Sequence, residues 1–308
     1  MKYRRLGKTN LRVSVIGLGT WQFGGEWGKD FSQDEVAAML ARARDLGINL
    51  IDTAECYGDH TSEALIGGAI HRERDRWVIA TKFGHKFHGY MNRTDERRPD
   101  QVVRQLEESL RALRTDYVDL WQYHSLPDHD FDSDELQSSV IRMKQQGKVR
   151  HIGNSISMNI DSRHQTNASP KAQVEVLQLL YNRLDRRPEE YALAAAQRMD
   201  MSVMARVPLA SGFLTGKYKP GTRFPPGDYR AQKKPEEIDK ILAEVERIKQ
   251  TELPPGMDMA TWATAWPLQH PAVTCVIPGV KSVEQVESNA RAADLDLARD
   301  DHPQAWRE

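Results

Sequence analysis

The chain has 308 residues, a length that fits one large domain or two small ones, with a formal net charge of -1 and 28% charged residues. It has no basic block that would favour nucleic acid, and no apolar run approaches the roughly 20 residues of a membrane span. Its two cysteines are too few for a disulfide framework. We therefore expect a soluble protein of the reducing cytoplasm, without nucleic-acid or membrane partners.

The first predicted element is a β-hairpin, with strands at 3–6 and 11–13 and a turn at 7–10. After it, short β-branched runs alternate with helical patterns, which is typical of βα units and a parallel sheet. The eight runs are 15–18, 50–52, 77–81, 118–122, 151–153, 174–179, 202–206 and 273–277.

Helix signals lie between these runs. Ser32 and Glu35 form a capping-box pattern that opens a helix to Leu46, and Pro99 begins another helix. Eight such units in about 300 residues predict a (β/α)8 barrel, with residues 1–308 as a single domain. A doubly wound dinucleotide fold is less consistent with the sequence, because Gln22 replaces the third glycine after Gly17-Leu18-Gly19.

A long Pro- and Gly-rich segment follows the seventh predicted strand, at residues 219–227. In this fold such loops often act as lids or binding loops, which is the role we expect for residues 218–235. A passive surface loop is the alternative.

Polar side chains end three consecutive predicted strands. Asp52 ends the second, Lys82 follows the third and His124 follows the fourth, while Tyr57 lies in the loop after Asp52. In a parallel barrel these strand ends converge on the face that carries the chemistry. An acid, a phenol, an amine and an imidazole gathered there indicate proton transfer to a carbonyl oxygen.

Each of the four residues has a role in such a reaction. A carbonyl that accepts hydride needs a proton, and a tyrosine can supply it although its normal pKa is near 10. We expect the Lys82 ammonium to lower the pKa of Tyr57, and Asp52 to keep Lys82 charged and in place. His124 would hydrogen-bond the carbonyl oxygen or share the proton. A structural Asp52–Lys82 ion pair and a core histidine are the alternatives when each residue is taken alone.

These residues resemble the pattern of the aldo-keto reductase family: Asp-x4-Tyr after the second strand, Lys after the third and His after the fourth. The likeness extends from Gly17-Leu18-Gly19-Thr20-Trp21 to Ile277-Pro278-Gly279, nearly the whole chain. It implies a nicotinamide cofactor extended across the barrel mouth. The positions that match the family's cofactor site are Gly19, Thr20, Trp21, Asp52, Ser155, Gln178, Arg206, Pro208, Leu209, Ser211, Leu214, Gly216, Lys217, Gly279, Lys281, Ser282, Gln285 and Asn289.

Three positions depart from that pattern. Arg206 stands where well-known members stack an aromatic on the nicotinamide, Ile156 replaces a usual Asn, and Gly279 replaces a basic residue. A planar guanidinium can also stack. Lys281 and Ser282 still offer a charge and a hydroxyl to a 2′-phosphate, so the resemblance favours NADPH, with NADH possible.

An apolar pocket for a small carbonyl substrate is expected around Trp21, Trp27 and Phe87, next to Tyr57 and His124. A metal site is not expected: the first strand offers no ligand, and His85 and His88 fall in a predicted loop. The expected activity is reversible NAD(P)H-dependent reduction of an aldehyde or ketone. A sugar or alcohol dehydrogenase, a weakly active cofactor-sensing regulatory subunit and a metal-dependent hydrolase are the alternatives.

Overall fold

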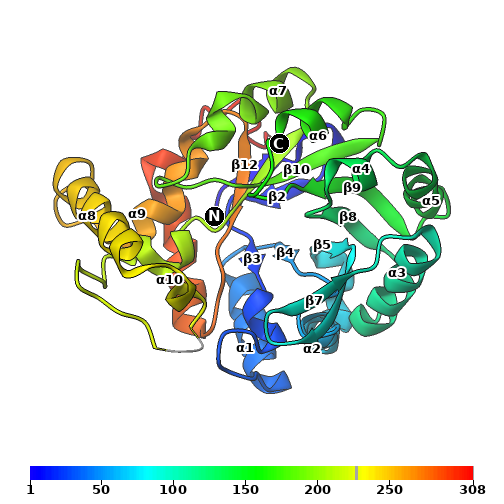
Figure 1. Cartoon of the computed structure of the whole chain (residues 1–308), viewed down its shortest axis with the longest axis horizontal. Helices are drawn as coiled ribbons and strands as arrows, with labels where there is room; N and C mark the ends of the chain where they lie inside the picture. The colour runs from blue at the N-terminus through cyan, green and yellow to red at the C-terminus, as the bar shows by residue number, and fades with distance from the viewer. Residues whose placement is uncertain (226–227, 308) are drawn as a thin grey trace.

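The computed structural model describes residues 1–225 and 228–307 and contains an eight-stranded parallel barrel surrounded by helices (Figure 1). Parallel bridges from Ile16 to Val276 and from Gly19 to Gly279 join the first strand to the last and close the sheet. In barrel order the strands are β3 (Leu18–Gly19), β4 (Leu50–Asp52), β5 (Val78–Phe83), β8 (Val118–His124), β9 (Val149–Ser155), β10 (Val174–Leu180), β11 (Ser202–Arg206) and β12 (Val273–Ile277).

Helices follow the strands and cover the outside of the barrel, while α8 projects to one side (Figure 1). No helix in the described part of the chain is long and apolar enough to cross a membrane. The helices are α1 (Gln33–Asp45), α2 (Thr61–Ile70), α3 (Pro99–Leu113), α4 (Asp128–Phe131), α5 (Asp134–Gln145), α6 (Arg163–Ala168), α7 (Ala192–Arg198), α8 (Pro235–Thr251), α9 (Met259–Ala265) and α10 (Val283–Arg291).

The core has two parts, one inside the barrel and one between the sheet and the helices. Inside, alternate strand residues such as Leu120 and Met204 are fully buried. The N-terminal hairpin of β1 (Tyr3–Arg5) and β2 (Arg12–Ser14) adds Leu6 and Val13 to this inner cluster. Parallel-sheet strands buried on both faces read as continuous apolar runs, which is why the sequence revealed them.

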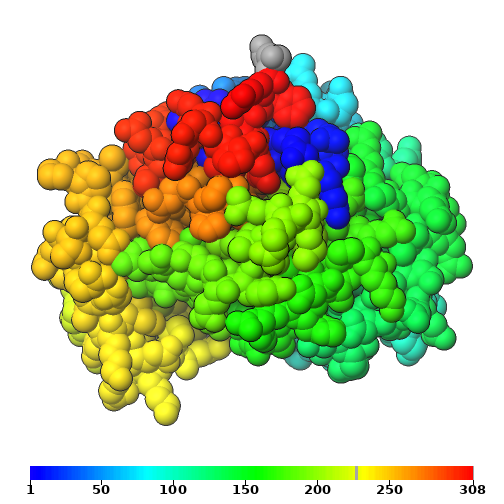
Figure 2. Space-filling view, turned by 90° about the horizontal axis from the view of Figure 1, so that it is seen from above, coloured from blue at the N-terminus to red at the C-terminus, as the bar shows by residue number. Residues whose placement is uncertain are grey.

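The C-terminal residues pack beside this hairpin (Figure 2). Arg5 donates its backbone N–H to the carbonyl oxygen of Gln304 at 2.7 Å, and Trp306 donates to Tyr3 at 2.9 Å. The two ends of the chain therefore hold each other on the same part of the barrel.

The predicted fold is confirmed, with local differences. Strands β4, β11 and β12 have the predicted bounds, and Ser32 caps α1 through the expected capping box with Glu35. The first strand is shorter than predicted because only Leu18 and Gly19 are laddered to β4.

A second hairpin, β6 (His85–Gly89) and β7 (Asn92–Asp95), was not predicted. It places His85 and His88 on a strand, not in the loop expected for them. Of the proposed lid segment, residues 226 and 227 lie outside the described residues.

Candidate active site

The four predicted catalytic residues meet at one end of the barrel. Asp52 is the last residue of β4, Lys82 lies in β5 and His124 ends β8. Tyr57 lies in the loop before α2, where Gly24 packs so closely that an added Cβ would lie 2.5 Å from the Tyr57 carbonyl carbon. This backbone contact fixes the loop that carries the phenol.

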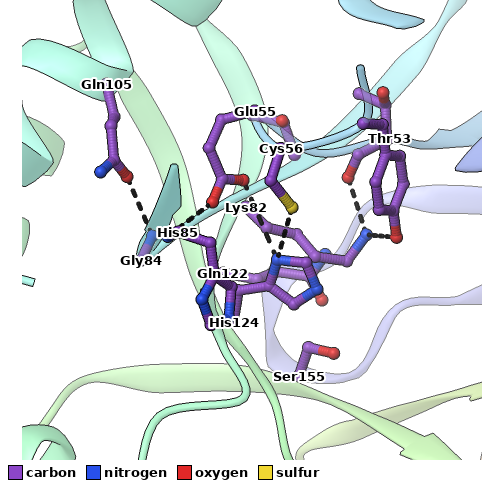
Figure 3. Close-up of polar contacts among 12 residues, drawn as sticks. Thr53, Glu55, Cys56, Lys82, Gly84, His85, Gln105, Gln122, His124 and Ser155 are labelled. Atoms are coloured by element: carbon purple, nitrogen blue, oxygen red, sulfur yellow. Dashed lines mark hydrogen bonds and ion pairs between the residues drawn. The ribbon is translucent and has the colours of Figure 1, made fainter. Parts of the chain in front are cut away.

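Lys82 is at the centre of this group (Figure 3). Its ammonium donates to Asp52 Oδ2 at 2.8 Å, to the Thr53 carbonyl oxygen at 2.7 Å and to the Tyr57 phenolic oxygen at 3.1 Å. The side chains of Lys82 and Asp52 are 0% and 5% exposed. All three donors of a buried ammonium are thus used, as its burial requires.

The second oxygen of Asp52 is held by two amides. Gln178 and Gln122 donate to Asp52 Oδ1 at 2.6 and 3.2 Å, and Ser155 donates to Gln178 Oε1 at 3.1 Å. Ser155, Gln178 and Asp52 therefore belong to one network with Lys82. Gln122 was missed in the sequence, although it lies two residues before His124 on β8 and so shares its face.

Burial controls the acidity of the phenol. It raises the pKa of Tyr57 to about 12, and Asp52 adds to this, while Lys82 acts in the opposite direction. Lys82 thus lowers the pKa of Tyr57, as expected, but the prediction that this pKa would lie below its ordinary value is wrong. Burial works against the charge of Lys82, yet Asp52 and Tyr57 outweigh it and raise the pKa of that ammonium above its ordinary value.

His124 directs Nδ1 away from this network, toward Cys56 and Glu55 (Figure 3). Nδ1 lies 3.7 Å from Cys56 Sγ and 3.9 Å from Glu55 Oε2. Burial lowers the pKa of His124 to about 3, although Glu55 opposes this. Burial would raise the pKa of Glu55, but its contacts with His124 and His85 outweigh burial and lower it. Both directions favour a neutral imidazole beside an ionised carboxylate.

Aromatic side chains surround the phenol. Trp21 and Phe87 pack against the cluster that contains Tyr57, and Trp27 makes an edge contact with Trp21 at 5.4 Å between ring centroids. Tyr229, from the predicted lid segment, contacts Trp21 at 6.0 Å. The expected substrate residues thus lie together.

An ion pair between a buried carboxylate and a partly exposed guanidinium also borders this region. Trp21 Nε1 donates to Glu26 Oε2 at 2.6 Å, and Arg93 pairs with the same oxygen. The Arg93 guanidinium lies 6.0 Å from the Tyr57 ring centroid. Sequence reasoning missed both residues, because Arg93 reaches the site only through the unpredicted β6–β7 hairpin.

A family model described as the Aldo/keto reductase family matches residues 15–306. The chain belongs to this family. It is 30% identical over 300 residues to the uncharacterized oxidoreductase YqkF of Bacillus subtilis, covering 96% of this chain and 92% of the relative. It is 29% identical over 316 residues to an NADH-specific methylglyoxal reductase of Escherichia coli, covering 97% and 95%.

Solved aldo-keto reductases have the same fold. The holo form of AKR11C1 from Bacillus halodurans matches with a TM-score of 0.80 and 28% identity, covering 96% of this chain and 91% of that one. The glycerol dehydrogenase AKR11B4 from Gluconobacter oxydans matches with a TM-score of 0.79 and 27% identity, covering 100% and 98%. Aldo-keto reductases are oxidoreductases that use NADH or NADPH.

The residues assigned to the cofactor follow the strands around the barrel mouth. Gly19, Ser155 and Arg206 end β3, β9 and β11, and Gln178 lies two residues before the end of β10. The other positions end β4 or follow β3, β11 and β12, those after β11 being spread over the long segment that contains the 3-10 turn Ala210–Thr215, or lie in α10: Thr20, Trp21, Asp52, Pro208, Leu209, Ser211, Leu214, Gly216, Lys217, Gly279, Lys281, Ser282, Gln285 and Asn289.

At the predicted adenosine end, most polar groups already have partners. Ser282 Oγ accepts the N–H of Gln285 and caps α10, and Gln285 Oε1 accepts the N–H of Lys281 at 2.9 Å. Lys281 lies over the Trp27 ring at 5.0 Å. Asn289 Nδ2 is buried and has no hydrogen-bond partner among the described residues. An amide left without an acceptor at this place fits a polar ligand.

Two of the departures make specific contacts in the structure. Arg206 reaches the Ile156 carbonyl oxygen at 3.3 Å through Nη2, and burial lowers its pKa. A Cβ at Gly279 would lie 2.2 Å from Gln22 Nε2. Gln22 therefore fills the space into which a basic side chain at position 279 would extend.

Possible metal ligands gather at one place in the described part of the chain. One ligand atom each from Glu55, Cys56 and His124 lies within 4.8 Å of the others. His88 is not in this group and contacts Thr94 Oγ1 at 2.7 Å. The group includes the predicted catalytic histidine.

Proposed function

We propose that this protein reduces a small aldehyde or ketone to an alcohol, reversibly and with NADPH, and that Tyr57 is the proton donor. The observation that carries the proposal is the position of Lys82, which contacts Asp52 at 2.8 Å and Tyr57 at 3.1 Å within a buried site. An isolated structural ion pair would not need a phenol as a third member.

The arrangement supplies a proton where charge develops. When bound, a reduced nicotinamide would supply the hydride for the carbonyl carbon, and the carbonyl oxygen would then need a proton. The Tyr57 hydroxyl gives its proton to that oxygen, and the adjacent Lys82 ammonium stabilises the phenolate left behind. Asp52 keeps the ammonium charged, and Trp21 and Phe87 keep water from the phenol.

Asp52, Ser155 and Gln178 also explain how the nicotinamide end would be held. The network that fixes Lys82 includes an amide and a hydroxyl, which are suitable partners for a carboxamide. The same side chains thus connect cofactor position to proton transfer.

Lys281 supports NADPH over NADH. It lies at the end of the site where the adenosine is expected, whereas the neighbouring Arg230 and Lys29 are paired with Asp228 and Glu35. A positive charge at this end favours an additional phosphate group. Similar proteins differ in this respect: the E. coli relative is named as NADH-specific, and a fission-yeast relative, 28% identical, carries NADP(+) in its name.

A second candidate is oxidation of a polyol. The polar Glu26–Arg93 pair borders the site, and the matching Gluconobacter structure is described as a glycerol dehydrogenase. Hydroxyl groups next to the reacting carbon would find both a donor and an acceptor there.

The test is to follow nicotinamide absorbance with purified protein, both cofactors and a panel of carbonyls and polyols. We expect carbonyl-dependent oxidation of NADPH that survives a chelator. Cofactor binding without turnover of any carbonyl or alcohol would instead support a regulatory subunit, and chelator-sensitive hydrolysis would support a metal enzyme.

A further inference from the structure

Glu55 is a buried acid that the proposed reaction does not use. It lies between Asp52 and Tyr57 in the chain, is 2% exposed, and directs its carboxylate toward Nδ1 of His124 (Figure 3). Its Oε1 accepts the backbone N–H of His85 at 3.0 Å. Its Oε2 has no hydrogen-bond partner among the described residues and lies 3.9 Å from His124 Nδ1.

The proton of His124 can be located by counting donors. A carboxylate only accepts, and a neutral imidazole carries one N–H, on either Nδ1 or Nε2. Three atoms meet here: Glu55 Oε2, His124 Nδ1 and Cys56 Sγ. With a bare Nδ1, the single thiol proton would face two acceptors, Nδ1 and Oε2, and one of the two would have no donor. If Nδ1 carries the proton, the imidazole or the thiol provides a donor to Oε2.

We infer that Glu55 is a positioning residue that keeps the proton of His124 on Nδ1, so that Nε2 serves the active site as an acceptor. The separation of 3.9 Å exceeds the usual hydrogen-bond range of about 2.7–3.2 Å, so the attraction in this structure is mainly electrostatic. The negative charge of Glu55 attracts an N–H group on Nδ1, and so favours the same tautomer as the donor count. This inference rests on the proposed function.

The other charged and titratable groups near His124 do not reverse this assignment. Lys82 and His85 disfavour a second proton on the ring, and Cys56 is a buried thiol whose pKa is raised by burial. The His85 ring lies 5.1 Å away and its own Nδ1 faces Asp95, and the Tyr57 ring lies 6.1 Å away.

The consequence concerns which oxygen His124 recognises. A bare Nε2 accepts a hydrogen bond from the hydroxyl of an alcohol, whereas a protonated Nε2 would donate to a carbonyl oxygen. Tyr57 is then the group that donates to the carbonyl, and His124 holds the hydroxyl formed from it. The two residues thus have separate tasks at the same oxygen.

The direct test is nitrogen-15 NMR of the whole protein with labelled histidine, with the His124 signals identified by their absence in His124→Asn. We expect wild-type shifts of a neutral ring protonated at Nδ1, at neutral pH. Shifts of a ring protonated at Nε2 would overturn the inference. This measurement does not depend on activity or on the folding of a Glu55 variant.

Steady-state kinetics provide a second test of the inference. In Glu55→Met we expect kcat/KM to fall about ten- to a hundredfold, the loss typical of one interaction with a charged group. The kcat/KM values for reduction and for oxidation should fall by the same factor, because no substitution in the enzyme changes the equilibrium constant of the reaction. Cofactor affinity should not change. Unchanged kcat/KM with an unchanged tautomer in Glu55→Met would overturn the inference.

Glu63→Met is the matched control. Glu63 is also buried and also faces a histidine Nδ1, that of His60 at 2.5 Å, but it lies outside the site. We expect this variant to retain the His124 tautomer and kcat/KM, whereas an equal loss in both variants would mean that Glu55 is merely structural. An inactive wild type would contradict the proposed function, while the NMR result would still decide the role of Glu55.

Discussion

The Lys82 ammonium lies 3.1 Å from the Tyr57 oxygen, and yet burial holds the pKa of that phenol near 12. In the proposed reaction the phenol would thus be protonated before the transfer. Lys82 would therefore stabilise the phenolate after proton transfer, and would not ionise the phenol beforehand. Asp52 makes this possible, because it balances the buried ammonium.

Lys82→Met should be strongly destabilising. It leaves the buried Asp52 carboxylate without its counter-ion, and breaking a buried pair in this way typically costs about 3–5 kcal/mol. Denaturant unfolding measures the loss. The control is the double variant Asp52→Asn/Lys82→Met, which should recover most of the stability while remaining inactive. A single variant as stable as wild type would mean that the pair is not balanced as described.

Lys281→Ala should weaken NADPH binding about ten- to a hundredfold, since hydrogen bonds to charged groups contribute about 1.5–3 kcal/mol. NADH binding should change little. Lys281 donates to the Trp27 carbonyl oxygen at 3.4 Å, so tryptophan fluorescence should report directly on the change. Equal losses for both cofactors would show that Lys281 does not contact the 2′-phosphate.

His302 should make stability depend on pH. Its Nδ1 accepts the N–H of Gln304 and its Nε2 faces the His270 carbonyl oxygen, so the ring is neutral. Burial lowers its pKa from 6.5 to about 4. Between pH 6.5 and about 4, His302 binds a proton in the unfolded chain but stays neutral in the folded chain. The free energy of unfolding therefore decreases as the pH falls toward 4.

The free energy of unfolding, measured from pH 7 to pH 4 in wild type and His302→Gln, checks this. The carboxylates titrate equally in both proteins, so the variant should show the shallower decline. Parallel curves would mean that His302 takes up its proton equally in both states.

The barrel strands and the clustering of the four candidate residues could be predicted because both leave local patterns. Buried parallel strands are apolar throughout, and Asp52 and His124 end two of them. Gln122 could also have been found, since it shares the inward face of β8 with His124. Glu55 could have been noticed as a second acid between Asp52 and Tyr57.

Arg93 and Glu26 could not be predicted in this way. Both reach the site through tertiary contacts made by the β6–β7 hairpin and the loop after β3. The polar hairpin sequence shows little alternation, and its register shifts between Phe87 and Gly89. The pKa of Tyr57 could not be predicted from the sequence either, because it depends on how deeply folding buries the phenol.

Tyr57→Phe tests the central claim most directly. The substitution removes one hydroxyl from a packed site and leaves Lys82 paired with Asp52 and Thr53. Cofactor dissociation constants, measured in parallel, are the control. We expect kcat/KM for carbonyl reduction to fall about 10²–10⁴-fold, the usual contribution of general-acid catalysis, with cofactor affinity nearly unchanged. A Tyr57→Phe protein that retained most of its turnover would contradict the assignment of Tyr57 as the proton donor.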